Sequence, residues 1–358
     1  MQRGGRWIMK KVLVSASKDY EVIIDKGILS NIGEYIKNFV AGRIAAIITD
    51  DIVNELYSDE VEKSLSNEGY IVQKYVFKNG EQSKNANVYI DIVNFLARNK
   101  LSRTDVVVAL GGGVVGDMAG FAAATYLRGI KFVQIPTTLL AAVDSSVGGK
   151  TAIDLEVGKN LVGAFYQPDL VICDYKTLDT LKPETFSDGC AEVIKYGVIA
   201  SEELFYKCLK GIKENLEEII YECVSIKRNI VAEDEYDTGL RHLLNFGHTI
   251  GHGVEACSGY TITHGKAVAI GMVAITKAAI NLGLCKEDVL DKLNKCLELC
   301  NLPLSTSYSA DELYNIMLSD KKIDGSNINL VIPTCIGKAV LHKVSTSELM
   351  IYLQKGGL

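Results

Sequence analysis

The chain has 358 residues, of which 48% are hydrophobic and 23% are charged, and its formal net charge is −6. This composition is ordinary for a globular protein, and the length is sufficient for two domains. The acidic balance without any long basic run argues against a nucleic-acid-binding protein, and no apolar run reaches the ~18 residues of a membrane helix.

The cysteines and the start of the chain predict the compartment. Nine cysteines, an odd number without a C-x-x-C pair, favour a reducing compartment over a disulfide framework. The first ten residues contain bases but no apolar core of signal-peptide length. We therefore expect a cytoplasmic protein with no membrane partner. Met9 could be the true start, so residues 1–8 enter no fold argument.

The first half of the chain alternates predicted strands and helices. Strands are expected over residues 20–24, 43–49, 71–77, 105–110 and 131–135, and helices over 28–39, 52–68 and 87–99. Nearly continuous Val, Ile and Ala in strands that lie between helices indicate a parallel sheet covered on both faces. This pattern predicts a Rossmann-like α/β domain over residues 10–181.

From about Pro183 onward, long helical periods dominate. Helices are expected over residues 186–200, 212–232, 242–257, 266–282, 286–300 and 310–318, and only 327–332 and 339–344 look extended. No internal repeat or low-complexity linker interrupts the chain. The fold class is therefore α/β plus all-α, with a mostly helical domain over residues 182–358 and a boundary near residue 181.

A glycine motif follows one of the buried strands. Residues 111–117 (GGGVVGD) satisfy G-x-G-x-x-G where a helix should begin, a context that lets a pyrophosphate approach the helix N-terminal amides. The alternative is a turn required only for strand–helix packing. The acid expected ~20 residues further on is missing from residues 134–138, and Asp50, at the end of an earlier strand, could replace it. We therefore expect a dinucleotide site that is not the standard Rossmann half.

A second glycine segment carries lysines. Residues 145–151 (SSVGGKT) lack the P-loop spacing G-x-x-x-x-G-K-[ST] and follow no clear strand, so we reject a nucleoside triphosphatase. Lys150 and Lys159, with Asn160 beside the latter, instead suit an anionic substrate. A solvated surface position is the alternative for each lysine.

Three of the five histidines, His248, His252 and His264, fall within seventeen positions. Residues 245–252 (NFGHTIGH) are expected on a helix, with His248 and His252 one turn apart on the same face. The glutamate of H-E-x-x-H is missing, which argues against a metallopeptidase. Glu192 lies on an otherwise apolar predicted helix, where a buried acid needs a partner. Two histidines and a carboxylate would form an open, catalytic metal site, and a structural role for each histidine is the alternative.

Five blocks of the sequence resemble the signature blocks of 3-dehydroquinate synthases. They are residues 111–130, 136–154, 158–168, 191–197 and 244–253, within a resemblance that spans about residues 43–325 in order. The resemblance implies an N-terminal NAD-binding domain, a helical metal-binding domain, and a homodimer with its site between the domains. It also implies the conversion of 3-deoxy-D-arabino-heptulosonate 7-phosphate to 3-dehydroquinate and phosphate in the shikimate pathway.

The resemblance also implies residue roles, position by position. The implied ligands of Zn²⁺, for which Co²⁺ could substitute, are Glu192, His248 and His264, and His252 then acts in proton transfer or supports the ligands. The implied NAD contacts are Asp50, Glu81, Lys84, Gly113, Val114, Val115, Gly116, Asp117, Thr137, Thr138, Asp144, Lys150, Lys159, Thr177 and Thr180. The implied substrate pocket contains Arg128, Lys150, Asn160, Lys195, Lys227, Arg241, Asn245 and Lys322, with Arg128 reaching across the dimer.

The implied chemistry accounts for these residue types. NAD⁺ takes hydride from a carbinol whose oxygen the metal polarises, and the resulting ketone acidifies the neighbouring carbon so that phosphate can leave. NADH then returns the hydride, and ring opening and an intramolecular aldol closure follow. The substrate carries a carboxylate and a phosphate, which explains why an acidic protein gathers many bases at one place.

Three other functions compete with this one. Sugar-phosphate cyclases that make cyclitol or aminoglycoside precursors use substrates without the carboxylate, whereas Arg241, Asn245 and Lys322 favour a carboxylate-bearing substrate. A polyol dehydrogenase of the glycerol type would release NADH and would need fewer phosphate-binding bases. A dinucleotide-sensing binding protein would not need the predicted metal ligands.

Overall fold

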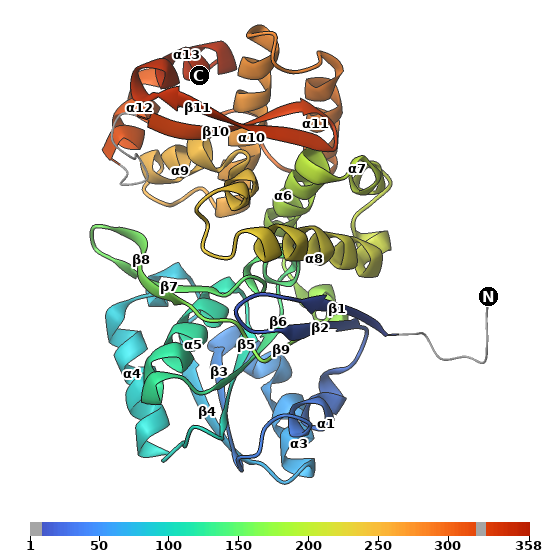
Figure 1. Ribbon diagram of the computed structural model, residues 1–358, viewed down its shortest axis with the longest axis vertical. Coiled ribbons are helices and arrows are strands. Elements are labelled where there is room, and N and C mark those ends of the chain that lie inside the picture. The colour runs from blue at the N-terminus through green and yellow to red at the C-terminus, as the bar shows by residue number, and fades with distance from the viewer. Residues whose placement is uncertain (1–8, 320–326) are drawn as a thin grey trace, which may run out of the picture. The chain divides into compact units, whose positions relative to one another are not determined.

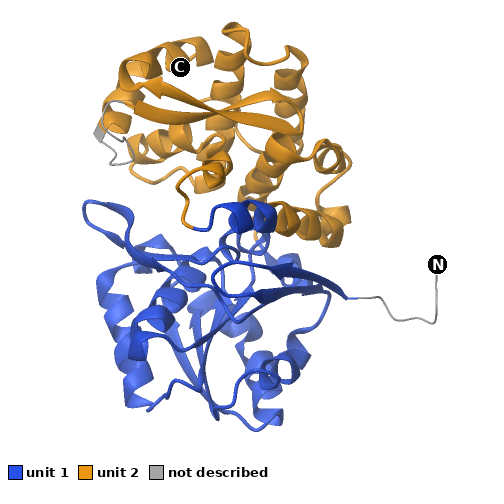
Figure 2. Cartoon of the chain, viewed as in Figure 1, with its two compact units in different colours: residues 1–181, 227–235 blue, residues 182–226, 236–358 orange. Residues whose placement is uncertain are grey.

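The computed structural model describes residues 9–319 and 327–358 and divides into two compact units (Figure 2). The first unit comprises residues up to Leu181 together with 227–235, and the second comprises 182–226 and 236–358. The sequence suggested one boundary near residue 181, whereas the structure groups a short later segment with the first unit. No helix in the described part of the chain is long and apolar enough to cross a membrane.

A seven-stranded sheet in the order β1-β2-β9-β6-β5-β3-β4 forms the centre of the first unit. The strands are β1 (Lys10–Val14), β2 (Tyr20–Asp25), β3 (Ile44–Asp50), β4 (Ile71–Phe77), β5 (Val106–Gly111), β6 (Lys131–Pro136) and β9 (Leu170–Asp174). Neighbouring strands are parallel except for β1 and β2. The predicted Rossmann-like parallel sheet is confirmed.

Short and long helices connect these strands. They are η1 (Leu29–Asn31), α1 (Ile32–Lys37), α2 (Asp51–Val53), η2 (Asn54–Ser58), α3 (Asp59–Asn67), η3 (Glu81–Ser83), α4 (Ala86–Arg98), α5 (Gly113–Thr125), η4 (Tyr126–Arg128), η5 (Ala141–Ser145) and η6 (Tyr175–Thr180). A hairpin of β7 (Lys150–Leu155) and β8 (Gly158–Phe165) was not expected from the sequence, because its alternation is interrupted by glycines and by exposed apolar side chains.

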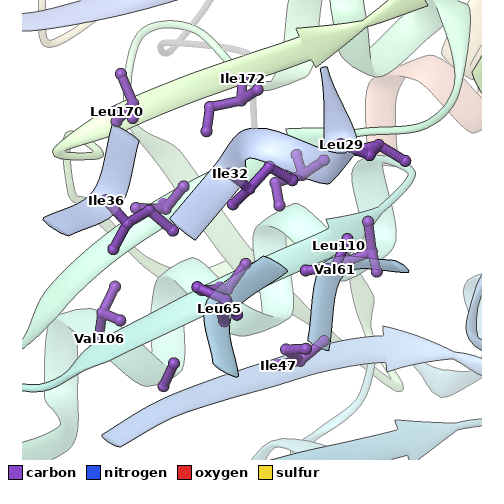
Figure 3. Close-up of a cluster of buried hydrophobic side chains, with 14 of the residues drawn as sticks. Leu29, Ile32, Ile36, Ile47, Val61, Leu65, Val106, Leu110, Leu170 and Ile172 are labelled. Carbon is purple, nitrogen blue, oxygen red and sulfur yellow. The ribbon is translucent and has the colours of Figure 1, made fainter. Parts of the chain in front are cut away.

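Both faces of the sheet are covered, which explains the continuous apolar strands. On one face, Ile32 of α1 and Leu65 of α3 pack with Ile47 of β3 (Figure 3). On the other face, Ile48 of the same strand packs with Met118 of α5. Adjacent residues of a strand point to opposite faces, so a strand buried on both sides has no polar alternation.

The second unit is mostly helical, as predicted, and contains one hairpin (Figure 1). Its elements are α6 (Pro183–Ala200), α7 (Glu202–Leu209), η7 (Lys213–Asn215), α8 (Leu216–Glu233), η8 (Leu240–Asn245), α9 (His248–Cys257), α10 (His264–Asn281), α11 (Asp288–Leu299), α12 (Ala310–Ser319), β10 (Asn327–Cys335), β11 (Lys338–Ser345) and α13 (Thr346–Gly356). The last residues of α8 belong by their contacts to the first unit.

The prediction of one helix over residues 242–257 was wrong. A 3₁₀ helix ends at Asn245 and α9 begins at His248, because Gly247 adopts a left-handed φ of 78° that side chains disfavour. A Cβ on Gly271 of α10 would lie 2.0 Å from the Gly247 carbonyl oxygen, so glycines permit a close approach of α9 and α10. This approach brings together the first residues of both helices, His248 and His264.

Candidate active site

Three predicted metal ligands meet inside the second unit. Glu192 comes from the middle of α6, and His248 and His264 are the first residues of α9 and α10. One potential ligand atom from each lies within 4.8 Å of the others. The Oε1 atom of Glu192 is 3.3 Å from His248 Nε2 and 3.2 Å from His264 Nε2. The three side chains therefore offer two imidazole nitrogens and a carboxylate to one point, which is a donor set that Zn²⁺ and Co²⁺ accept.

Glu192 is held in its charged form. Its side chain is 2% exposed, and burial alone would favour the neutral acid. The Lys195 ammonium and the neighbouring His248 outweigh burial and hold the pKa of Glu192 well below its ordinary value. Lys195 Nζ lies 2.5 Å from Oε2 as a buried ion pair. An ionised carboxylate is the form that binds a metal, so the charge state of Glu192 suits a ligand.

The pKa values of the two histidines shift in opposite directions. Burial lowers the pKa of His248 despite the nearby Glu192, which favours the neutral form that binds metals. For His264, burial is outweighed by hydrogen bonds to Glu192 and Glu255, which raise its pKa to about 10. A cation at this site would therefore displace a proton from His264.

His252 lies beside the three ligands. Its ring centroid is 5.6 Å from that of His248 and 6.2 Å from that of His264. His252 and His264 also form a second potential ligand group with Glu255, a buried residue of α9 that the sequence analysis missed. The signal was present, because Glu255 follows His248 and His252 at spacings of seven and three on the same helix face.

The glycine turn has the predicted strand–turn–helix context. β5 ends at Gly111, Gly112 is the N-cap residue, and α5 starts at Gly113. A Cβ on Gly112 would lie 3.0 Å from the Thr138 methyl group, and one on Gly113 would lie 3.2 Å from Ser145 Oγ. The glycines therefore allow this turn to pack closely against Thr138 and Ser145. The amides at the N-terminus of α5 are the kind of group that binds a phosphate.

Asp50 ends β3, which pairs directly with β5. The carboxyl ends of these parallel strands lie at the same edge of the sheet. Asp50 therefore lies on the strand next to the one that leads into the glycine turn. Its buried side chain accepts a hydrogen bond of 2.9 Å from the Val53 amide and caps α2. Three carboxylate lone pairs remain for a ligand hydroxyl group.

Lys84 connects two predicted ligand contacts of the first unit. Its buried ammonium lies 2.6 Å from Asp117 Oδ2 and donates a 2.5 Å hydrogen bond to Asn160 Oδ1. Burial lowers the pKa of Lys84, but Asp117 and Glu81 outweigh it and raise the pKa overall. Asn160 has a left-handed φ of 55°, and its backbone amide donates a hydrogen bond of 2.7 Å to Asp154 Oδ1. Asp117 and Asn160 are thus fixed by one ammonium.

Other predicted residues of the first unit are tied to its backbone. Lys227 Nζ donates to the Asp144 carbonyl oxygen at 2.8 Å and also pairs with the Asp144 carboxylate. Tyr57 donates to the Thr177 carbonyl oxygen at 3.0 Å and shares a hydrogen bond with Thr180. The Lys227 pairing explains why residues 227–235 group with the first unit.

The other predicted site residues differ in solvent exposure. Thr137 and Arg241 are buried, whereas Arg128 and Lys150 are exposed. Lys322 lies outside the described residues. The first unit contains Asp50, Glu81, Lys84, Gly113–Asp117, Arg128, Thr137, Thr138, Asp144, Lys150, Lys159, Asn160, Thr177, Thr180 and Lys227, and the second contains Glu192, Lys195, Arg241, Asn245, His248, His252 and His264.

Solved structures share this fold over almost the whole chain. A complex of 2-deoxy-scyllo-inosose synthase with carbaglucose-6-phosphate, NAD⁺ and Co²⁺ matches with a TM-score of 0.86 and 26% identity, covering 96% of this chain and 100% of that one. A 2-epi-5-epi-valiolone synthase from Streptomyces hygroscopicus with NAD⁺ and Zn²⁺ matches with a TM-score of 0.84 and 26% identity. The match covers 96% of this chain and 99% of that one. Glycerol dehydrogenase from Schizosaccharomyces pombe, at 0.62 and 16%, shares the fold alone. The fold is that of the sugar-phosphate cyclases.

The sequence matches the profile of the 3-dehydroquinate synthase N-terminal domain over residues 74–188 and that of the C-terminal domain over 189–323. The chain belongs to the 3-dehydroquinate synthase family, as its sequence blocks predicted. The 3-dehydroquinate synthase of Clostridium acetobutylicum is 47% identical over 94% of this chain and 96% of the relative. The 3-dehydroquinate synthase of Streptococcus mutans is 44% identical over 94% of this chain and 98% of the relative. That of Enterococcus faecalis is 43% identical over 98% of this chain and 99% of the relative.

Proposed function

We propose that this chain converts 3-deoxy-D-arabino-heptulosonate 7-phosphate to 3-dehydroquinate and phosphate, with NAD as a recycled cofactor and a divalent metal. It is then a phosphate-eliminating carbon–oxygen lyase of the shikimate pathway, working as a cytoplasmic homodimer. The observation that carries the proposal is the convergence of Glu192, His248 and His264 in a chain that also has the α5 glycine turn. Relatives that are 43–47% identical are 3-dehydroquinate synthases, which favours this activity over those of the 26% identical cyclases.

The second unit supplies the metal ligands Glu192, His248 and His264. When bound, Zn²⁺ or Co²⁺ polarises the oxygen of the carbinol that is oxidised. Lys195 stabilises the ionised form of Glu192, and its ammonium can also bind a substrate oxygen. His252, beside the ligand histidines but outside the ligand set, is the proton-transfer residue.

The first unit supplies the NAD contacts. The α5 turn binds the pyrophosphate through helix N-terminal amides, which have no intrahelical acceptor and attract anions. Asp50 accepts hydrogen bonds from ribose hydroxyl groups, as an acid at a neighbouring strand end can. The further NAD contacts in this proposal are Glu81, Lys84, Gly113, Val114, Val115, Gly116, Asp117, Thr137, Thr138, Asp144, Lys150, Lys159, Thr177 and Thr180.

Bases and amides bind the two anionic ends of the substrate. Lys150 and Asn160 bind the phosphate, and Lys84 fixes the Asn160 side chain for this purpose. Arg241 and Lys322 bind the carboxylate, and the buried guanidinium of Arg241 suits a bidentate contact. Lys227 and Asn245 are further substrate contacts in this proposal, and the exposed Arg128 acts on the partner subunit's substrate.

The proposal is tested by comparing three substrates with the wild-type enzyme. We expect turnover of 3-deoxy-D-arabino-heptulosonate 7-phosphate to exceed that of sedoheptulose 7-phosphate and glucose 6-phosphate, because only the first carries a carboxylate for Arg241 and Lys322. Steady-state kcat/KM with NAD and Zn²⁺ present is the measurement. Faster turnover of either carboxylate-free sugar would place the enzyme with the cyclitol-forming cyclases.

A further inference from the structure

The two ligand histidines receive different support at their outer nitrogens. His248 presents Nε2 to Glu192, and its Nδ1 lies 3.1 Å from the Phe246 carbonyl oxygen. A carbonyl oxygen only accepts hydrogen bonds, so Nδ1 of His248 carries a proton, which leaves Nε2 as the nitrogen that would bind a metal. The backbone between η8 and α9 thereby fixes the metal-binding tautomer of this histidine.

His264 is arranged in the same way, with a side chain in place of the carbonyl. Its Nε2 lies 3.2 Å from Glu192 Oε1, and its Nδ1 lies 3.4 Å from Glu255 Oε2. Glu255 is 4% exposed, and it lies on the face of α9 that also carries His248 and His252. A buried carboxylate has a high desolvation cost unless it interacts with a charged or donor group, and the imidazole of His264 provides one.

We propose that Glu255 is a positioning residue for the metal: its carboxylate accepts the Nδ1 proton of His264 and so aims the Nε2 lone pair at the ion shared with Glu192 and His248. A carboxylate at this position also makes the imidazole a stronger electron donor than a carbonyl does. This inference rests on the proposed metal site, and it assigns Glu255 a role that does not require contact with the substrate.

Metal affinity and the electronic spectrum of bound Co²⁺ test the inference without turnover. In Glu255→Ala we expect Co²⁺ and Zn²⁺ affinity, measured by competition with a chelator, to fall about 10- to 100-fold, as loss of such outer partners typically causes. The visible absorption bands of the Co²⁺ protein should shift, because the His264 ring is no longer held. Glu255→Gln, which retains an accepting oxygen without the charge, should show a smaller loss.

Controls separate this role from a general effect on the fold. Glu298→Gln changes an exposed glutamate of α11 in the same unit and should bind Co²⁺ as the wild type does. If Glu255→Ala does not fold, the nearly isosteric Glu255→Gln still reports the affinity. Unchanged affinity and an unchanged Co²⁺ spectrum in both Glu255 variants would overturn the proposal. So would a second equivalent of Co²⁺ in the wild type that Glu255→Ala loses, because Glu255 would then be a ligand of another ion.

The experiment also distinguishes failure of this inference from failure of the proposed function. A wild-type protein that binds no Co²⁺ or Zn²⁺ would refute the metal site itself, and the role of Glu255 would be refuted with it. A wild-type protein that binds one equivalent but does not convert the heptulosonate phosphate would refute the proposed reaction, and the Glu255 comparison would still stand.

Discussion

Removal of the divalent metal by a chelator should abolish turnover, and Zn²⁺ or Co²⁺ should restore it. The reason is that potential ligand atoms of Glu192, His248 and His264 lie within 4.8 Å of one another and that the low pKa of Glu192, caused by Lys195 and His248, keeps it ionised. In His248→Ala the loss of metal affinity should exceed the ~10- to 100-fold that removal of an outer partner costs, because a direct ligand is removed. Metal content after dialysis, with kcat/KM at added Zn²⁺, measures both effects.

His252→Ala is the matched control for His248→Ala, because both histidines lie on the same face of α9, one turn apart. Because His252 lies outside the proposed ligand set, the His252→Ala variant should keep the metal bound. Its kcat should fall roughly 10²- to 10⁴-fold, the usual contribution of a proton-transfer group. Equal loss of metal from the two variants would show that the division of roles is wrong. Full activity in metal-free protein would refute the metal requirement altogether.

Lys322→Ala should strongly impair use of the heptulosonate phosphate. Lys322 and Arg241 are proposed to bind the substrate carboxylate, and truncating one partner of a desolvated charged pair costs ~2–5 kcal/mol. This corresponds to a roughly 30- to 5,000-fold lower kcat/KM. Binding of inorganic phosphate, measured as competitive inhibition, should change much less, because the proposed phosphate contacts are Lys150 and Asn160.

Lys321→Ala removes the neighbouring charge and serves as the control for Lys322→Ala. It should leave kcat/KM close to that of the wild type, since no carboxylate contact is proposed for Lys321. If Lys321→Ala and Lys322→Ala lose the same activity, or if Lys322→Ala weakens phosphate inhibition as much as substrate use, the carboxylate role of Lys322 is incorrect.

Much of the fold could be predicted because burial on both faces has a clear sequence pattern. The residues of β3 and β5 are apolar throughout, since Ile47 and Ile48 enter different cores on opposite sides of the sheet. The β7–β8 hairpin was missed, because its strands contain glycines and its exposed apolar side chains mask the usual alternation. Local patterns also did not predict that residues 227–235 group with the first unit, because the contact of Lys227 with Asp144 joins positions far apart in the sequence.

Part of the candidate metal site could also be predicted from the sequence. A histidine at a predicted helix start, His264, and an acid on an apolar helix, Glu192, are visible in the sequence. The structure brings both together with His248. Spacing alone favoured His248 and His252 as a ligand pair, since it cannot show which imidazole nitrogens converge on Glu192. The break at Gly247 depends on the close crossing of α9 and α10, which is a tertiary contact that local periodicity does not report.

The most direct test of the central claim is to follow phosphate release and NADH absorbance together in one reaction with catalytic traces of NAD⁺. Because the hydride taken from the substrate is returned to it in the proposed reaction, we expect many equivalents of phosphate per NAD⁺ and no net NADH. Accumulation of NADH in proportion to the substrate consumed would contradict it and would indicate a polyol dehydrogenase that shares the fold.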